Sequence, residues 1–436
     1  MFQRSLDHFI RTLQDRPAPR WTGRITKVVG NVVESEGPFC SVGDCCEIAD
    51  RTGRIYPGEV VGFSGKHVLS MPLERPEGIG YGDRISTWGE RPTMRVSNHL
   101  LGRVLDGTGK PLDSRPPYEA DERWPLQPMP HMPLERAPIS EALGCGIRAI
   151  DGFITCARGQ RLGIFGGSGV GKSTLIGMMA RGSSADLAVI ALVGERGREV
   201  RDYLEKAIGR QGLENSVVVV STSDQSPLLR IRAALGASAI AEYFCAKGKH
   251  VLLVLDSLTR VAMAQREIGL AAGEPPTARG YTPSVFTLLA RLIERAGHFG
   301  KGSITAFYTV LMEGDDQQDV IVDAVRALLD GHIVLDRRLG NQGHYPAISV
   351  LDSLSRLMSV VTPRDVMEKA TRLRRLLAAY TASEDMIRVG AYQKGIDASL
   401  DQAIAAMPAI TGFLRQRSDE AAPFAQTVAA LQALPG

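Results

Sequence analysis

The strongest chemical signal in the chain is a glycine-rich segment that ends in lysine and serine, at residues 166–174. It fits the pattern GxxxxGK[ST], follows the apolar run 162–165 and precedes a helical pattern. Glycines in this pattern let backbone N–H groups close around phosphate oxygens, and the N-terminus of the helix adds its dipole. The lysine neutralises the β- and γ-phosphates, and the serine hydroxyl binds Mg²⁺. The predicted phosphate and Mg²⁺ site comprises Gly166, Gly167, Ser168, Gly169, Val170, Gly171, Lys172, Ser173 and Thr174.

Two acidic residues at the ends of apolar runs are candidates to complete this site. Asp256 ends the run 251–255, a pattern typical of a buried strand whose carboxylate holds Mg²⁺ directly or through water. Glu195 ends the first apolar run after the glycine-rich segment, where a carboxylate can face the γ-phosphate and polarise an attacking water. From spacing alone, a surface charge in a turn is an equally good interpretation of Glu195.

The elements that must position these residues alternate between apolar runs and helical patterns. Near-continuous apolar strands that alternate with helices are typical of a parallel sheet covered on both faces, so we predict an α/β core. The helices are expected from Lys172, from Arg198 and over 227–246. The predicted strands cover residues 160–165, 187–194, 216–222, 251–256 and 303–311.

The segments before and after this core differ from it in composition and in the secondary structure that they predict. Residues 24–95 contain short β-rich runs separated by turn residues, which predicts a small antiparallel barrel or sandwich. Residues 114–140 contain seven prolines, which excludes a helix and favours an extended covering segment or linker. From about Pro363 to the end of the chain the sequence predicts helices, with a turn at 390–395.

The first residues carry an apolar stripe at helical spacing. Residues 2–13 predict an amphipathic helix that ends before Pro17. Periodicity leaves two interpretations open, because such a helix either packs on its own domain or is offered to a partner. The stripe consists of Phe2, Leu6, Phe9, Ile10 and Leu13.

Composition excludes several classes of protein. The chain has 436 residues, of which 44% are hydrophobic and 23% charged, so it is not a wholly disordered chain. The net charge of +3 argues against a protein that covers nucleic acid backbones. No apolar run approaches about 18 residues and the start lacks a secretory signal, so we expect neither a membrane span nor export. Six cysteines without a CxxC pair favour a reduced, cytosolic protein over a zinc site or disulfide framework.

Seven longer segments, taken in order, resemble the ATPase of type III protein export. That family energises the flagellar export apparatus and the related injectisome, and it is similar to the catalytic subunit of rotary ATP synthases. The resemblance covers nearly the whole chain, although Thr282 and Ala290 stand where we expect proline. The segments are GGSGVGKST (166–174), VGERGREV (193–200), VLLVLDSLTR (251–260), ARGYTPSVFTLLARL (278–292), GSITAFYTVL (302–311), DGHIVLDR (330–337) and HYPAISVLDSLSR (344–356).

The resemblance implies roles for individual residues beside the catalytic Lys172. Glu195 resembles the catalytic carboxylate that orients the hydrolytic water, and Arg196 and Arg260 resemble phosphate-site arginines. Tyr345 resembles the aromatic residue that stacks on adenine. Arg356 resembles an arginine finger that reaches the γ-phosphate of a neighbouring subunit. Without the family, the residues themselves favour more ordinary roles, in which Arg356 pairs with an acid of its own subunit and Tyr345 is a core residue.

The resemblance also implies an architecture and an assembly. We expect a RecA-like P-loop core with a parallel sheet, preceded by a small β-barrel and followed by an α-helical domain. The expected boundaries are 1–19 for a partner-binding helix, 20–95 for the barrel, 96–360 for the core and 361–436 for the helical domain. The implied enzyme is an Mg²⁺-dependent ATPase that acts as a homohexameric ring.

The implied partners lie at both ends of the molecule. Residues 2–13 match the docking site for a regulatory, stator-like protein. The helical C-terminal domain would meet a central stalk protein, the export gate, export substrates and chaperones. The expected location is cytoplasmic, peripheral to the inner membrane at the export apparatus. No nucleic acid partner is expected.

Four alternatives remain open. Residues 314–317 (GDDQ) and the turn at 390–395 favour flagellar use, with an injectisome ATPase as the alternative. A rotary ATP synthase subunit would carry a strongly acidic loop where residues 390–397 read GAYQKGID. An RNA-translocating ATPase would need a basic and aromatic barrel face, whereas residues 24–95 offer only scattered aromatics. A non-enzymatic nucleotide-binding subunit is disfavoured by a carboxylate rather than an amide at Glu195.

Overall fold

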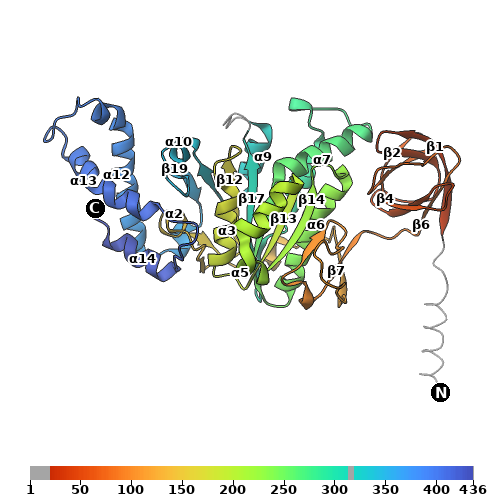
Figure 1. Ribbon diagram of the computed structural model, residues 1–436, viewed down its shortest axis with the longest axis horizontal. Helices are drawn as coiled ribbons and strands as arrows, with labels where there is room; N and C mark the ends of the chain where they lie inside the picture. The colour runs from red at the N-terminus through yellow and green to blue at the C-terminus, as the bar shows by residue number, and fades with distance from the viewer. Residues whose placement is uncertain (1–19, 313–318, 436) are drawn as a thin grey trace, which may run out of the picture.

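The computed structural model describes residues 20–312 and 319–435. The molecule is elongated, with a β-barrel at one end, an α/β core in the middle and a helical region at the other end (Figure 1). The helix predicted over residues 2–13 lies outside the described residues. In the part of the chain that is described, no helix combines the length and apolar character that a membrane span requires.

The N-terminal barrel is built from six strands and closes on itself in the order β1-β2-β5-β4-β3-β6. All its strand pairs are antiparallel, which confirms the predicted small antiparallel barrel. Its interior is filled by side chains such as Ile25, Val33, Ile48, Tyr56 and Ile85. The strands are β1 (Trp21–Val29), β2 (Val32–Glu36), β3 (Cys45–Ala49), β4 (Ile55–Ser64), β5 (His67–Pro72) and β6 (Arg84–Thr87).

The core is a nine-stranded sheet in the order β19-β18-β12-β17-β15-β13-β14-β8, with β16 beside β17. Every pair is parallel except β18 with β19 and β16 with β17, which confirms the predicted parallel sheet. The carboxyl ends of the parallel strands therefore meet at one edge. The strands are β8 (Val104–Asp106), β12 (Arg161–Gly166), β13 (Leu187–Glu195), β14 (Ser216–Thr222), β15 (His250–Asp256), β16 (Gly297–His298), β17 (Ser303–Leu311), β18 (Gly331–Leu335) and β19 (Ile348–Ser355).

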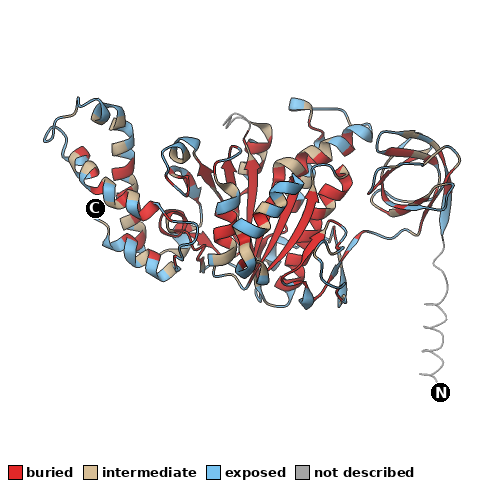
Figure 2. Ribbon diagram, in the orientation of Figure 1, coloured by how far each residue is buried: buried red, intermediate tan, exposed pale blue. Residues whose placement is uncertain are grey.

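Helices cover both faces of this sheet, so its strands are apolar at nearly every position. In β13, Val189 and Ala191 join the apolar layer under α6, whereas Ile190 and Leu192 join the layer under α3. Figure 2 shows the strands as the buried centre of the molecule. The helices are α2 (Arg148–Phe153), α3 (Lys172–Gly182), α4 (Gly197–Asp202), α5 (Gly209–Glu214), α6 (Pro227–Ala246), α7 (Leu258–Ala271), α8 (Pro283–Ile293), α9 (Val320–Leu328) and α10 (Arg337–Asn341), with short 3₁₀ helices η1 (Asn98–Leu100) and η4 (Ala278–Gly280).

The helix expected from Arg198 is divided into three pieces. The π-helical segment η3 (Tyr203–Ile208) separates α4 from α5. Gly209, at φ 65°, has a backbone conformation that a continuous α-helix does not use, and it begins the last piece. The sequence analysis predicted one helix from Arg198 and did not predict this interruption.

The proline-rich residues 114–140, all of which are described, contain no α-helix. Their regular elements are β9 (Glu122–Pro125), which pairs with β7 (Thr93–Val96), and the single-turn 3₁₀ helix η2 (Pro133–Glu135). The chain then pairs β10 (Ala142–Leu143) with β11 (Cys156–Ala157) before it enters the core. The segment is therefore extended and free of α-helix, and its role as a covering segment or a linker stays a prediction.

The C-terminal region is helical, as predicted. It comprises α11 (Met358–Val361), α12 (Arg364–Arg388), α13 (Ala398–Leu414) and α14 (Phe424–Ala433), and the predicted turn at 390–395 lies between α12 and α13. Phe413 of α13 packs edge-on against Phe153 of α2, with ring centroids 6.0 Å apart. This contact packs the helical region against the core.

Candidate active site

The glycine-rich loop connects β12 to α3 at the carboxyl edge of the sheet. Gly169 and Gly171 have φ of 80° and 100°, which residues with a side chain rarely adopt. Gly171 is the N-cap of α3, so Lys172 begins the helix. The loop therefore aims unpaired N–H groups and the positive end of the helix dipole at one point, which is the arrangement that binds phosphate.

Lys172 and Asp256 meet across this loop. Lys172 Nζ lies 2.7 Å from Asp256 Oδ1, and the Asp256 side chain is 3% exposed. Thr309 at the end of β17 directs its hydroxyl to the same oxygen over 2.7 Å. Because β12, β17 and β15 are parallel neighbours, their carboxyl ends bring these groups together. The two motifs that the sequence placed far apart thus form one polar cluster.

Glu195 joins this cluster from the end of β13. Leu192 of β13 is in register with Asp256 of β15, so Glu195 lies just beyond the Asp256 carboxylate. Burial, followed by the negative charge of Asp256, raises the pKa of Glu195 to about 7. Lys172 opposes that rise. A part-buried carboxylate with a pKa near neutrality is suited to general-base chemistry.

Two predicted phosphate-site arginines occupy different environments. The side chain of Arg260 on α7 passes over Gly194, where a Cβ would lie 2.9 Å from Arg260 Cβ. Arg260 Nε is buried and has no hydrogen-bond partner within the described residues. Arg196 is exposed at the start of α4, with Nη1 3.4 Å from Glu199 Oε1. The structure brings Arg260 toward the cluster and places Arg196 at its outer surface.

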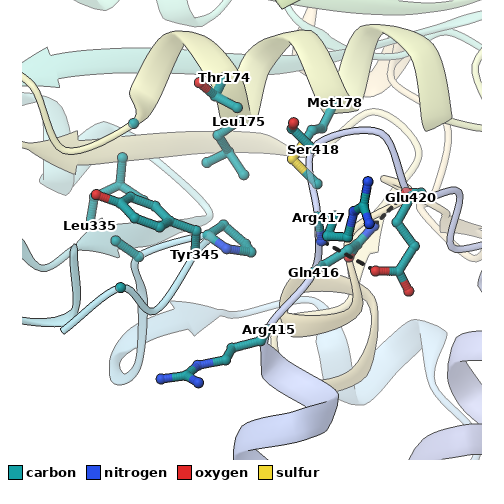
Figure 3. Close-up of a pocket in the computed structure, with 14 residues that line it drawn as sticks. Thr174, Leu175, Met178, Leu335, Tyr345, Arg415, Gln416, Arg417, Ser418 and Glu420 are labelled. Carbon is teal, nitrogen blue, oxygen red and sulfur yellow. Dashed lines mark hydrogen bonds between the residues drawn. The ribbon is translucent and has the colours of Figure 1, made fainter.

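A cavity of about 510 Å³ opens beside the glycine-rich loop. Tyr345 lines it and is 50% exposed, so this residue is not part of the core. Figure 3 shows Tyr345 on one side of the cavity and Arg417 and Glu420 across from it. The backbone N–H of Gln416 donates to Tyr345 O over 2.9 Å, which joins the two walls. The size and position of this cavity suit a nucleotide base.

Arg356 lies far from the glycine-rich loop of its own chain. Ile348 at the start of β19 pairs with Leu335, near the loop, whereas Ser355 pairs with Gly331 at the opposite edge of the sheet. The N–H of Arg356 donates to Asp330 O over 2.9 Å.

Arg161 lies at the same end of the strands as Arg356, because the carbonyl of Arg161 accepts a hydrogen bond from the N–H of Asp330 over 2.9 Å. Arg161 begins β12, and the length of that strand separates this edge from the loop by about 16 Å. Arg356 therefore cannot serve the nucleotide site of its own chain.

Comparisons with known proteins agree on one family. Residues 146–355 match the ATP synthase alpha/beta family, nucleotide-binding domain, and residues 362–433 match the T3SS EscN ATPase C-terminal domain. The flagellum-specific ATP synthase of Bacillus subtilis (strain 168) is 50% identical over 416 residues, which cover 95% of each chain. The chain belongs to the family of flagellar and type III secretion ATPases.

Two further relatives support this assignment of the export ATPase. The type 3 secretion system ATPase of Xanthomonas euvesicatoria is 47% identical over 96% of this chain and 95% of its own. The structure of the assembled ATPase EscN from enteropathogenic E. coli matches with a TM-score of 0.87 and 42% identity, over 94% of this chain and 98% of that one. The chain is therefore an ATP-hydrolysing enzyme of the P-loop class.

Sequence reasoning missed three parts of this export ATPase site. Thr309, which contacts Asp256, sits in an apolar strand run where a hydroxyl gives no signal. Arg337 donates to Ser168 O over 3.2 Å and so supports the glycine-rich loop. The second wall of the cavity comes from residues 415–420, a polar stretch after α13 with no motif of its own.

Proposed function

We propose that this export ATPase hydrolyses ATP at sites shared between neighbouring copies of a homohexameric ring, and that hydrolysis energises flagellar protein export. The observation that carries the proposal is the position of Arg356, on the sheet edge opposite its own Lys172. In a ring of identical copies joined head to tail, that edge of one copy faces the nucleotide site of the next. The comparison structure of EscN, described as assembled, supports the oligomer.

The donor groups at the loop fit an Mg²⁺ ion. Asp256 supplies a carboxylate and Ser173 a hydroxyl, and oxygen donors of this kind suit Mg²⁺. These two residues would hold the ion, which would neutralise charge on the β- and γ-phosphates. Because Lys172 Nζ already lies 2.7 Å from Asp256, the lysine is placed to contact phosphate beside the metal ligands.

The protein residues divide the reaction between them. Lys172 and Arg260 neutralise the phosphates within the chain, and Arg196 is proposed to add to this at the outer side. Glu195 accepts a proton from the attacking water, and it holds that water in line with the γ-phosphate. Arg356 of the neighbouring copy stabilises the charge that develops on the transferred group, so turnover requires assembly.

Of the two export processes, we favour flagellar export as the one that this ATPase energises. The turn at 390–395 favours this use, and the flagellum-specific ATP synthase of Bacillus subtilis, at 50% identity, is consistent with it. Residues 314–317, which also favour it, lie outside the described residues. Secretion through an injectisome is the second candidate. Restoring motility, but not effector secretion, to strains that lack the corresponding ATPase would decide for flagellar use.

The proposed partners lie at the two ends of the chain. EscN has been solved with its central stalk EscO, and we assign the same kind of partner to the helical C-terminal domain of this chain, along with the export gate, substrates and chaperones. Residues 2–13 are proposed to bind a regulatory, stator-like protein. The complex would act in the cytoplasm, peripheral to the inner membrane. Deletion of residues 2–13 should abolish binding of that protein and leave ATP hydrolysis intact, whereas a globally unfolded product would favour a packing role.

The central test is phosphate release by the purified full chain with Mg²⁺ and ATP. Turnover per chain should rise with protein concentration as copies assemble. Arg356→Ala should bind ATP normally and lose roughly 10³- to 10⁵-fold in turnover, the contribution of an arginine finger. Near-normal hydrolysis by that variant, or no hydrolysis by the assembled wild type, would contradict the proposal.

A further inference from the structure

Three large apolar side chains stand out from the proline-rich segment 128–136, which we call the strap. Met129 is 89% exposed, Met132 is 65% exposed and Leu134 is 98% exposed. Side chains of this size rarely gather at the surface of a protein that has no partner for them. The strap therefore presents an apolar surface that its own chain leaves uncovered.

The strap is held firmly in place. The ring of His131 packs 4.5 Å from the ring of Phe299, measured between centroids. Arg136 donates from Nη1 to Ala296 O over 2.8 Å and pairs through Nη2 with Glu294 Oε2 over 3.1 Å. Prolines 128, 130 and 133 fix their own φ angles. A rigid segment that already exposes its apolar side chains loses little entropy when it binds.

Ion pairs connect the strap to the edge that carries Arg356. Glu294, which pairs with Arg136, also pairs with Arg161. Arg161 Nε lies 3.1 Å from Asp330 Oδ2, and the carbonyl of Asp330 accepts the N–H of Arg356 over 2.9 Å. The strap and Arg356 therefore share the sheet edge that faces away from the nucleotide site of the same chain.

The apolar area of the strap is too small to form a stable interface by itself. A stable interface buries about 800 Å² on each partner, far more than three side chains supply. The strap must then belong to a larger contact surface. Around Arg356, Leu354 is 46% exposed and Val360 is 59% exposed, so further uncovered apolar residues lie on this edge.

We propose that the strap is a contact between copies of this chain, and that Met129, Met132 and Leu134 pack against the next copy beside the site that Arg356 enters. The inference rests on the proposed function, because that function assigns Arg356 to the neighbouring site. Burial of the strap fixes the edge of one copy against the next. Through Arg136, Glu294 and Arg161, it also fixes the backbone that carries Arg356.

The test replaces the strap side chains in the full-length protein. The triple variant Met129→Ser, Met132→Ser, Leu134→Ser removes the apolar surface, and thermal melting verifies that it folds. Mass photometry with Mg²⁺ and a non-hydrolysable ATP analogue measures the concentration at which half of the chains are assembled. We expect that concentration to rise at least tenfold. Turnover should be lost at low protein concentration and recovered at high concentration.

A matched control changes the same positions but keeps them apolar. The variant Met129→Leu, Met132→Leu, Leu134→Met preserves volume and apolar character, so it should assemble and hydrolyse ATP as the wild type does. Assembly of the serine variant at the wild-type concentration would overturn the proposal. So would a wild-type chain that remains monomeric while it hydrolyses ATP.

The assembly measurement separates this proposal from the proposed function. If Arg356→Ala assembled normally and kept full turnover, the assignment of Arg356 would fail while the effect of the strap on assembly stood. If the serine variant assembled normally and Arg356→Ala lost turnover, the strap proposal alone would fail.

Discussion

The hydroxyl of Thr309 lies 2.7 Å from Asp256 Oδ1, the same carboxylate oxygen that Lys172 contacts. Both residues are buried, because Thr309 is fully covered and Asp256 is 2% exposed. The Thr309 bond fixes the rotation of the carboxylate and keeps Oδ1 on the side of the lysine. Asp256 is also the carboxylate that would hold Mg²⁺ together with Ser173, so this bond positions a candidate metal ligand.

Replacement of Thr309 by valine should therefore weaken catalysis without removing the site. Loss of a residue that orients a metal ligand typically costs about 10- to 100-fold in metal affinity or activity. We expect Thr309→Val to lower kcat and to raise the Mg²⁺ concentration needed for half-maximal turnover, with little change in KM for ATP. Thr309→Ser keeps the hydroxyl and should restore most of the activity. An Mg²⁺ dependence equal to that of the wild type would exclude the positioning role.

Hydrolysis should depend on the protonation of Glu195. Its pKa is raised to about 7, first by burial and then by Asp256, so the carboxyl is increasingly protonated as the pH falls below 7. A protonated carboxyl cannot take a proton from water. The pH dependence of kcat/KM reports the free enzyme, so kcat/KM should fall toward lower pH and level off above about 8. The measurement is kcat/KM for ATP between pH 5.5 and 9.

Replacement of Glu195 by glutamine separates binding from chemistry. The amide keeps the shape of the side chain but cannot act as a base, so turnover should fall by roughly 10²- to 10⁴-fold. ATP affinity should stay close to that of the wild type, and the residual activity should lose its decline at low pH. Full activity in Glu195→Gln would remove this residue from the mechanism.

Features that are carried by consecutive residues could be predicted from the sequence, whereas features formed by long-range packing could not. The glycine-rich loop was predictable, because consecutive residues such as Gly171 and Lys172 carry all of its chemistry. The sheet was predictable because parallel strands buried on both faces are apolar throughout. The strand that holds Thr309 and the chain segment 415–420 reach the site only through long-range packing. No spacing rule links residues that meet across a fold, so those contacts required the structure.

The exposed ring of Tyr345 should contribute to nucleotide affinity. Stacking of a base on an aromatic side chain is worth about 1–3 kcal/mol, so Tyr345→Ala should weaken ATP binding by roughly 5- to 150-fold. Tyr345→Phe keeps the ring and should bind almost as the wild type does. Titration with a fluorescent ATP analogue measures both variants. Equal affinities in the alanine and phenylalanine variants would show that the base binds elsewhere in the cavity.

Two inactive chains should restore activity to one another when they are mixed. A Glu195→Gln chain lacks the base but offers Arg356, whereas an Arg356→Ala chain has an intact pocket and lacks the arginine. In randomly mixed rings at equal amounts, roughly a quarter of the interfaces join an intact pocket to an intact arginine. Phosphate release should recover to about that share of the wild-type rate.

The control for this mixture pairs two defects of the same pocket. Glu195→Gln mixed with Lys172→Ala leaves every pocket defective, although every neighbour offers Arg356, so no activity should return. Co-purification through different affinity tags verifies that both mixtures form joint assemblies. If the first mixture formed such assemblies and stayed inactive, Arg356 would not act across the boundary between copies, and its place on the far edge of the sheet would need another explanation.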